Sequence, residues 1–378
     1  MQDDLFGGEP SPAPSSAPPP APSPKPSTHD APTGLTPKAP RTPRVAGQVT
    51  PAPTLPEHAD LARRLPEQVR LGTSSWSYPG WHGLVWADEL NERRLAKDGL
   101  TAYSQHPLLR TVSIDRSFYQ PLSVGQYTAY ASQVPDGFRF IVKAPASVSD
   151  ALIRDESGRG KAHNPLFLDP DLALREFIEP AMQGLGHKVG ALVFQISPLP
   201  HLWLRQPNRL MDQLEHMLGK MPALQAAIPG AVIAVEVRDH ALVSPALAQV
   251  LKRTGHSHCL GLHARMPPIE DQLPMLRSLW PGPLVCRWNL HRRHGAFGYE
   301  DARAMYAPFD HIQDADPQTR ETLARVIVAT ARAGLPVHVS ISNKAEGCAP
   351  LSVGLLAQEV VAQWEAAPAA PQTPQASR

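Results

Sequence analysis

Short apolar runs recur along residues 69–342 and alternate with longer segments that have helical spacing. Most of these runs are continuous rather than alternating in polarity, which is typical of strands buried on both faces. They predict eight strands, at residues 69–76, 109–115, 138–144, 190–197, 231–238, 257–263, 283–290 and 336–342.

Helical periodicity fills the segments between the runs. It predicts helices at residues 124–134, 171–182, 208–218, 244–254 and 319–333. Eight strands that each precede helical sequence predict an α/β fold, a single (β/α)8 barrel of the TIM type. A doubly wound open sheet is the alternative, but the sequence after the first run, GTSSWSYPG, lacks the GxGxxG spacing of a phosphate-binding turn.

Proline marks the ends of the chain. Of 43 prolines, 16 lie within the first 56 residues. A segment so rich in Pro, Ala and Ser cannot bury enough apolar surface to offset the entropy of ordering it, so we expect residues 1–61 to be disordered. Residues 367–378 have a similar composition and predict a second disordered tail. These boundaries assign residues 62–366 to the barrel.

The charge balance excludes a global electrostatic field. Lys and Arg number 36 against 35 Asp and Glu, so any affinity for anions must reside in a local cluster. The acidic start, MQDDLFGGEP, predicts no secretory signal, and no apolar run approaches the roughly 20 residues of a membrane span. Three cysteines without a CxxC pair predict no disulfide framework, and we therefore expect a cytoplasmic protein.

Aromatic residues concentrate after the first predicted strand, in LGTSSWSYPGWHGLVW at residues 71–86. In barrels of this type, binding sites are built from the loops at the C-terminal ends of the strands. Such rings could form a wall that stacks a sugar or a base, or a hydrophobic plug over the barrel end. We expect Tyr78, Trp81 and Tyr119 to contact a substrate, whereas Trp76 and Phe118 fit the plug.

Polar residues at the ends of buried strands indicate the site, because burying a charge without a partner is costly. Glu236 and Arg238 lie two apart and therefore face the same side of their strand. They could form a structural salt bridge, or Glu236 could serve as a general base beside cations that bind an anionic substrate. Lys143 could act as a base or a Schiff-base amine, or pair with Glu236. The predicted catalytic residues are Glu236, Lys143 and His263.

A metal site at the same end of the barrel is an alternative. His263, His291, Glu236, Asp115 and Asp239 could all reach the barrel mouth. The chain has no HxH or HExxH spacing, so we predict no metal ligands and leave the cofactor unknown.

Basic residues follow the last two strands, in NLHRRHGAFGYED and SNKAEGCAP. TIM barrels often bind phosphate with the loops after strands seven and eight, and arginine binds phosphate with two parallel hydrogen bonds. The alternative is an ordinary solvated basic surface. The predicted substrate-binding residues are Tyr78, Trp81, Tyr119, Gln195, Arg238, Arg287, Arg292, Arg293, Asn343 and Lys344.

Six stretches carry a family resemblance: GTSSWSYPGWHG, SFYQPLS, FRFIVKAP, LVFQISPLP, AVEVRD and SNKAEGCAP. Their order and spacing resemble the YecE-like family, a family of unknown function numbered 72, over residues 69–362. The resemblance implies a TIM-type barrel with a site at its mouth, but no reaction, because the activity of the family is not established. The matching positions are Gly72, Trp76, Trp81, Gly83, Phe118, Tyr119, Lys143, Gln195, Glu236, Arg238, Arg287 and Asn343.

Several polar positions depart from the pattern of that family. Ser113 and Asp115 stand where the family carries Glu and Asn, and His263 stands where it carries Asp. Asn289 and Ser342 also differ, replacing a His and the first of two Asn. A changed polar set on a kept aromatic frame suggests a divergent branch with altered or lost chemistry.

These features predict a barrel whose mouth binds, and could hydrolyse, a phosphate-bearing ligand such as a nucleotide, a sugar phosphate or nucleic acid. A non-catalytic binding module is the alternative. A third hypothesis is a DNA-repair accessory, because Gln2–Phe6 (QDDLF) resembles the Q-x-x-L-F peptide that docks on the bacterial sliding clamp. The proline-rich leader of about fifty residues would then act as a tether.

Overall fold

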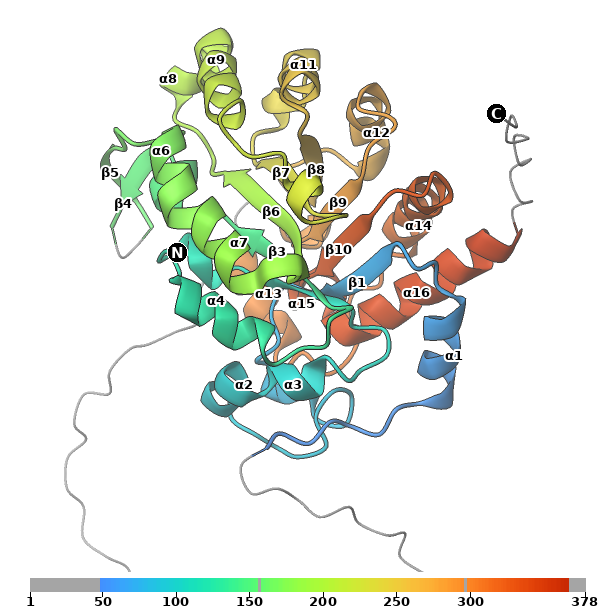
Figure 1. Cartoon of the computed structure of the whole chain (residues 1–378). Helices are drawn as coiled ribbons and strands as arrows, with labels where there is room; N and C mark the ends of the chain where they lie inside the picture. Colours follow the sequence, from blue (N-terminus) through green and yellow to red (C-terminus); the bar gives the residue numbers. More distant parts are fainter. Residues whose placement is uncertain (1–47, 156–157, 296–297, 367–378) are drawn as a thin grey trace, which may run out of the picture.

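Eight parallel strands close into a barrel in the order β1-β10-β9-β8-β7-β6-β3-β2 (Figure 1). This computed structural model describes residues 48–155, 158–295 and 298–366. The barrel strands are β1 (Val69–Thr73), β2 (Thr111–Ile114), β3 (Arg139–Lys143), β6 (Val189–Ile196), β7 (Val232–Val237), β8 (Ser257–Leu262), β9 (Leu284–Trp288) and β10 (Val337–Ile341). The predicted fold is therefore confirmed, with a strand at each of the eight expected places.

The inward faces of the strands change character along the barrel axis. The apolar cluster inside the barrel consists of Ile141, Ala191, Val193, Val232, Ala234, Cys259 and Val285. Because side chains alternate along a strand, the next inward positions after Ala234 are Glu236 and Arg238, and the position after Val285 is Arg287. The barrel is thus apolar in its middle and charged toward the C-terminal ends of its strands.

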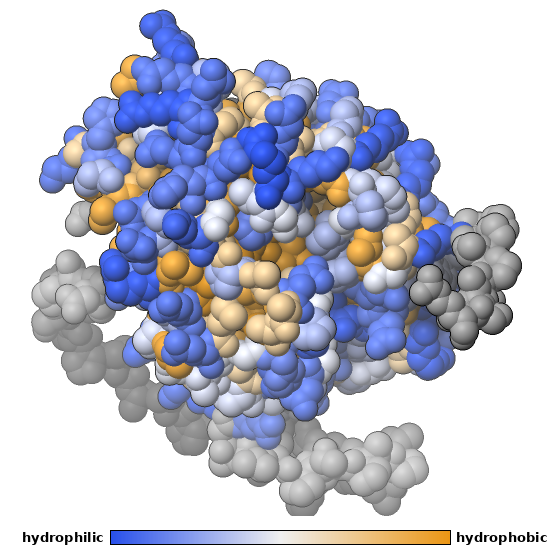
Figure 2. Space-filling model, turned by 45° about the horizontal axis from the view of Figure 1, so that its top comes forward, coloured by the Kyte–Doolittle hydropathy of each residue, from blue (hydrophilic) through white to orange (hydrophobic). Residues whose placement is uncertain are grey.

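Helices surround the barrel, and they begin where local sequence supports a helix start. In α11 (Pro245–Thr254), Ser244 accepts a hydrogen bond from the Leu247 backbone N–H, and proline occupies the first turn, where its missing N–H costs little. The face of the molecule in Figure 2 is mostly hydrophilic, with hydrophobic residues confined to patches, as expected of helices that bury one side.

The expected helices all form. They are α4 (Val124–Ala131), α6 (Pro170–Ala173) continuing through a π-helical turn (Leu174–Ile178) into α7 (Glu179–Leu185), α9 (Pro207–Leu218), α11 and α14 (Pro317–Arg332). The remaining helices are α1 (Pro56–Arg64), α2 (Glu92–Asp98), α3 (Leu100–Tyr103), α5 (Ala146–Ser149), α8 (His201–Leu204), α10 (Leu224–Ala227), α12 (Ile269–Ser278), α13 (Tyr299–Tyr306), α15 (Asn343–Glu346) and α16 (Ala349–Ala366). Within the described ranges, none of these helices combines the length and hydropathy of a membrane span.

A short antiparallel hairpin interrupts the connection between β3 and α6. It consists of β4 (Leu152–Arg154) and β5 (Gly160–His163), and its second strand is exposed. The sequence pattern did not predict it, because it buries too little to show an apolar run.

The folded region extends further toward the N-terminus than the predicted boundary at residue 62. Val49 is buried, and the Ala52 backbone N–H donates to the Val85 carbonyl. Helix α1 packs on α16, where Arg64 forms an ion pair with Glu365 (Figure 1). At the other end, α16 extends to Ala366, the last of the described residues. The clamp-like peptide Gln2–Phe6 lies outside the described residues.

Candidate functional site

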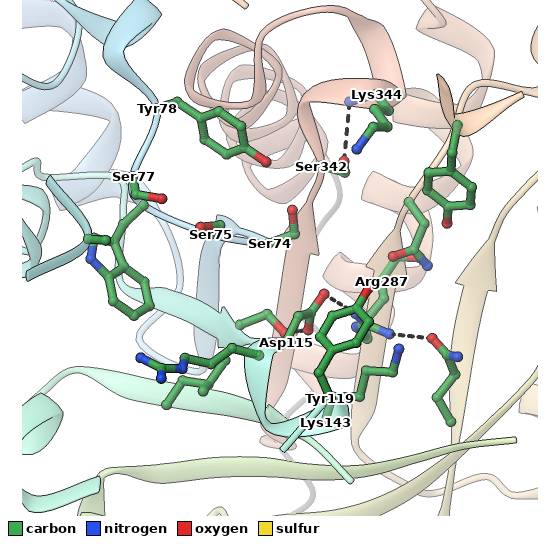
Figure 3. Close-up of a pocket in the computed structure, with 18 of the residues that line it drawn as sticks. Ser74, Ser75, Ser77, Tyr78, Asp115, Tyr119, Lys143, Arg287, Ser342 and Lys344 are labelled. Carbon is green, nitrogen blue, oxygen red and sulfur yellow. Dashed lines mark hydrogen bonds and ion pairs between the residues drawn. The ribbon is translucent and has the colours of Figure 1, made fainter. Parts of the chain in front are cut away.

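The C-terminal ends of the barrel strands surround a cavity of about 140 Å³ (Figure 3). One water needs roughly 10–15 Å³ of volume measured in this way, so the cavity has room for a small ligand. Its lining comes from the ends of seven strands, all except β8, or the loops after them, and from α2, α4 and α13. The lining residues are Ser74, Ser75, Trp76, Ser77, Tyr78, Ala96, Ser113, Ile114, Asp115, Arg116, Tyr119, Tyr130, Lys143, Gln195, Arg238, Arg287, Asn289, Tyr299, Ser342 and Lys344.

Glu236 organises the charges beneath this cavity. Its carboxylate has no exposure, and Oε2 accepts a hydrogen bond of 2.6 Å from Nη1 of Arg287. Nε of Arg238 lies 2.7 Å from Oε1, as a close ion pair rather than an aligned hydrogen bond. Gly261 leaves room for this carboxylate, because a Cβ there would lie 3.3 Å from Glu236 Cγ. Glu236 thus forms the salt bridge that was one of the two alternatives for it. It does not line the cavity.

The pKa of Glu236 shows that the pair is strongly coupled. Burial alone would raise this pKa, but the charges of Arg238 and Arg287 lower it to about 2. Burial would likewise lower the pKa of Arg287, whereas Asp115 and Glu236 raise it. Both partners are therefore charged throughout the physiological pH range.

Arg238 and Arg287 are held in place by further acceptors. Oε1 of Gln195 accepts from Arg238 Nη2 at 2.8 Å and from Arg287 Nη1 at 3.2 Å. Arg287 Nη2 also donates to Asp115 at 2.6 Å, and Asp115 in turn accepts from Ser113 Oγ (Figure 3). These bonds fix the two guanidinium groups in the floor of the cavity, where both have almost no exposure.

Lys143 lines the cavity without a counterion. Its Nζ lies 3.5 Å from the centre of the Phe118 ring, and within the described chain no carboxylate oxygen is within 4 Å of it. The predicted contact pair with Glu236 is therefore not formed, because Arg238 and Arg287 occupy both carboxylate oxygens. Burial lowers the pKa of Lys143 to about 7; the negative charge of Asp115 opposes this shift, and the positive charge of Arg287 adds to it.

His263 lies behind the cavity rather than in its lining. Its Nδ1 accepts from the Arg265 backbone N–H at 3.0 Å, and its ring packs on Tyr299 at 5.1 Å. Burial and the nearby charge of Arg238 lower the pKa of His263 to about 3, so the ring is neutral. The structure therefore separates this predicted catalytic residue from the cavity.

The aromatic residues divide between site and plug. Tyr78 and Tyr119 line the cavity, and Tyr119 is 56% exposed. Trp81, predicted to contact a substrate, is fully buried, and its Nε1 donates to Asn343 Oδ1 at 3.2 Å. Asn343 is also buried, this bond joins the first loop to the last one, and neither residue is part of the cavity lining.

The basic residues after the last two strands also divide. Lys344 lines the cavity, with Nζ 5.4 Å from the centre of the Tyr299 ring. Arg292 and Arg293 lie on an exposed 3-10 turn outside the lining. Arg293 forms an ion pair with Asp314, and Arg292 donates to the Met266 carbonyl at 3.1 Å. Arg292 and Arg293 therefore lie outside the cavity, whereas Lys344, Arg238 and Arg287 line it.

Several lining residues were not predicted from the sequence pattern. Tyr299 comes from α13, and its hydroxyl accepts from Arg238 Nη1 at 3.2 Å. Nothing in a strand pattern could place this helix over the mouth. Ser74 and Ser75 follow directly after β1, where the run of small polar residues between the strand and Trp76 was an available signal.

Metal ligands are not grouped in the described part of the chain, where no three His, Cys, Asp or Glu side chains converge. Two of the residues weighed for this role have other partners. Asp239 accepts from the Leu199 backbone N–H at 2.8 Å, and His291 Nδ1 accepts from the Arg293 backbone N–H.

Two known proteins that resemble this chain belong to one family. The family described as "Protein of unknown function DUF72" matches residues 70–377. A DUF72 family protein from Enterococcus faecalis V583 has 17% sequence identity and a TM-score of 0.52, over 78% of this chain and 95% of that chain. A DUF72 family protein from Thermotoga maritima MSB8 has 15% identity and a TM-score of 0.44, over 78% of this chain and 98% of that chain. No curated protein matches.

The likeness to the Enterococcus protein shows the barrel fold, and neither structure's description states a substrate. The family match extends from β1 past the end of α16, and it confirms the resemblance seen in the six sequence motifs. The chain belongs to the DUF72 family.

Proposed function

We propose that the barrel mouth binds a small phosphate-bearing ligand. The observation that carries this proposal is the charge of the cavity lining. It contains a single carboxylate, that of Asp115, against five basic side chains, namely Arg116, Lys143, Arg238, Arg287 and Lys344. Even with Glu236 beneath the floor, cations outnumber carboxylates among the described residues here.

Four of these five cations, all except Arg116, are buried, and a net positive charge in a site with little water favours an anionic ligand. Arg238 and Arg287 are already oriented by Glu236 and Gln195, so they lose little freedom when a ligand binds. Hydroxyl groups from Ser74, Ser75 and Ser342 can donate to further phosphate oxygens. Phosphate, with up to two negative charges, suits this set better than a neutral ligand.

The organic part of the ligand would meet the aromatic side of the mouth. Tyr78 and Tyr119 line the cavity, and the exposed Tyr119 marks its opening toward solvent. Figure 3 shows Tyr78 near Ser75 on one side of the cavity and Lys344 with Ser342 beside it. A ring or a short carbon chain could lie against the tyrosines while its phosphate faces the cations.

Hydrolysis is not part of this proposal. Glu236, the predicted general base, has both carboxylate oxygens occupied by arginines and does not face the cavity. Asp115 already holds Arg287 and Ser113. We therefore propose that the site binds a ligand without hydrolysing it. The polar residues that depart from the family pattern would then determine which ligand binds.

Calorimetric titration tests the proposal with inorganic phosphate, sugar phosphates, a mononucleotide and uncharged glycerol. We expect a phosphate-bearing compound to bind below millimolar concentration and glycerol not to bind. Lys344→Met should weaken binding about tenfold or more, since a charge-assisted hydrogen bond contributes roughly 1.5–3 kcal/mol. Arg292→Met, outside the lining, is the matched control and should bind like the parent. Equal affinity for glycerol and its phosphate would refute the proposal.

A further inference from the structure

Two buried lysines of this protein have opposite surroundings. Nζ of Lys188 donates to the carbonyls of Ala131 and Val134, at 2.9 and 2.7 Å, and lies 3.5 Å from an Asp136 carboxylate oxygen. Nζ of Lys143 lies over the Phe118 ring, and no oxygen of the described chain accepts a hydrogen bond from it. Lys188 thus has two carbonyl acceptors and a nearby carboxylate for its ammonium hydrogens, whereas Lys143 has no acceptor in the described chain.

The position of Lys143 also differs from that of an ordinary buried lysine. It ends β3 on the inward face, among the lining residues of the mouth, close enough to Arg238 and Arg287 to feel their charges. A ligand whose phosphate contacts these arginines could therefore place its neighbouring carbon atoms beside this amine. Only 8% of Lys143 is exposed, so bulk water competes little for the same space.

We propose that Lys143 forms an imine with the carbonyl group of a phosphorylated aldehyde or ketone bound in the mouth. This inference rests on the proposed function, since the phosphate positions the carbonyl. It narrows the ligand from any phosphate-bearing molecule to one that also carries a reactive carbonyl.

The chemistry requires no metal and no oxidant. The lone pair of the uncharged amine forms a bond to the carbonyl carbon, and the electrons of the C=O π bond move to oxygen, which takes up a proton. The resulting carbinolamine then loses its hydroxyl group with a second proton, as one water molecule. Both protons come from the nitrogen, directly or through solvent, so an amine and a carbonyl compound yield an imine and water.

The protonation state of Lys143 supports this role. An ordinary lysine is almost wholly protonated at neutral pH and lacks the lone pair. Burial lowers the pKa of Lys143 to about 7, and although the charge of Asp115 opposes the shift, the arginines add to it. A substantial fraction of the amine is therefore uncharged at neutral pH, as imine formation requires.

Reductive trapping tests the proposal on the full chain. The protein is incubated with dihydroxyacetone phosphate and sodium cyanoborohydride, which reduces an imine to a stable secondary amine. Intact mass should rise by the mass of the probe less one oxygen atom, and peptide mapping should place the label on Lys143. Label on Lys188 or Lys344 instead would overturn the proposal.

Two controls separate this proposal from the proposed function. Lys143→Arg keeps a positive charge but cannot form an imine. This variant should therefore carry no label at residue 143, while calorimetry should still detect phosphate binding. If the parent binds phosphate but Lys143 is never labelled, the imine is refuted and phosphate binding stands. If uncharged dihydroxyacetone labels Lys143 as fast as its phosphate does, phosphate positioning is refuted instead.

Discussion

Two pairs of arginines at the same end of the barrel have opposite environments. Arg238 and Arg287 project inward from β7 and β9 and are almost fully buried around Glu236. Arg292 and Arg293 lie only a few residues beyond β9, yet both are exposed and outside the cavity. The same residue type therefore forms the floor of a site in one place and a solvated surface in the other. The proposed phosphate site therefore depends on cations that the strands orient, not on the local density of positive charge.

The largest expected effect comes from removing the carboxylate that holds the buried pair. Glu236→Gln leaves Arg238 and Arg287 without their shared counterion, and breaking a buried ion pair costs about 3–5 kcal/mol. Urea unfolding at neutral pH measures this loss. Glu215→Gln, which breaks the exposed pair with Arg253, is the control and should have little effect. Equal stability of Glu236→Gln and the parent would show that the arginines do not depend on this carboxylate.

The pKa of Glu236 extends this prediction to acid pH. A carboxyl whose pKa falls from 4.5 to about 2 on folding stabilises the protein fully above its unfolded pKa. That contribution should disappear as the pH falls from about 4.5 toward 2. The free energy of unfolding of Glu236→Gln should therefore vary less over this range than that of the parent.

A smaller effect should follow from Lys143, which has no carboxylate oxygen within 4 Å in the described chain. Its pKa falls on folding from 10.5 to about 7, so between these values the unfolded chain binds one more proton than the folded one. The stability of the parent should then rise with pH relative to Lys143→Met, by about 2 kcal/mol between pH 7 and 9. Urea unfolding of both proteins at the two pH values measures the difference. Parallel profiles would mean that Lys143 titrates normally.

The smallest effect is expected at the exposed pair. Changing Arg292 and Arg293 together to Ala removes one ion pair with Asp314 and one bond to a backbone carbonyl. Because these groups are exposed, the melting temperature should change little, and the affinity for a phosphate compound should stay within about twofold. A tenfold loss of affinity would instead support the phosphate site predicted from the loop sequences.

The barrel itself was predictable, because strands buried on both faces leave continuous apolar runs, such as those of β6 and β7. The spacing of Glu236 and Arg238 likewise placed both on one face of β7, since side chains alternate with a fixed period. These are local rules, and they held for Lys143, Gln195 and Arg287 as well, which all face the mouth or its floor.

Loop residues could not be placed in this way. Trp81 and Tyr78 are three apart in one aromatic stretch, yet only Tyr78 reaches the cavity, because the 3-10 turn (Pro79–Trp81) directs the tryptophan toward Asn343. The partner of Glu236 was also ambiguous, since Arg287 and Lys143 come from distant strands and only the geometry of the barrel decides between them. Position in a loop and choice among several cations are properties of the assembled fold.

The position of a bound anion in a crystal would show where this protein holds a phosphate group. Crystals of the full chain soaked in tungstate, a tetrahedral analogue of phosphate with a strong anomalous signal, would show where such an ion binds. We expect a peak in the mouth, within hydrogen-bonding distance of Arg238, Arg287 or Lys344. A peak at Arg292 and Arg293 with an empty mouth would contradict this expectation.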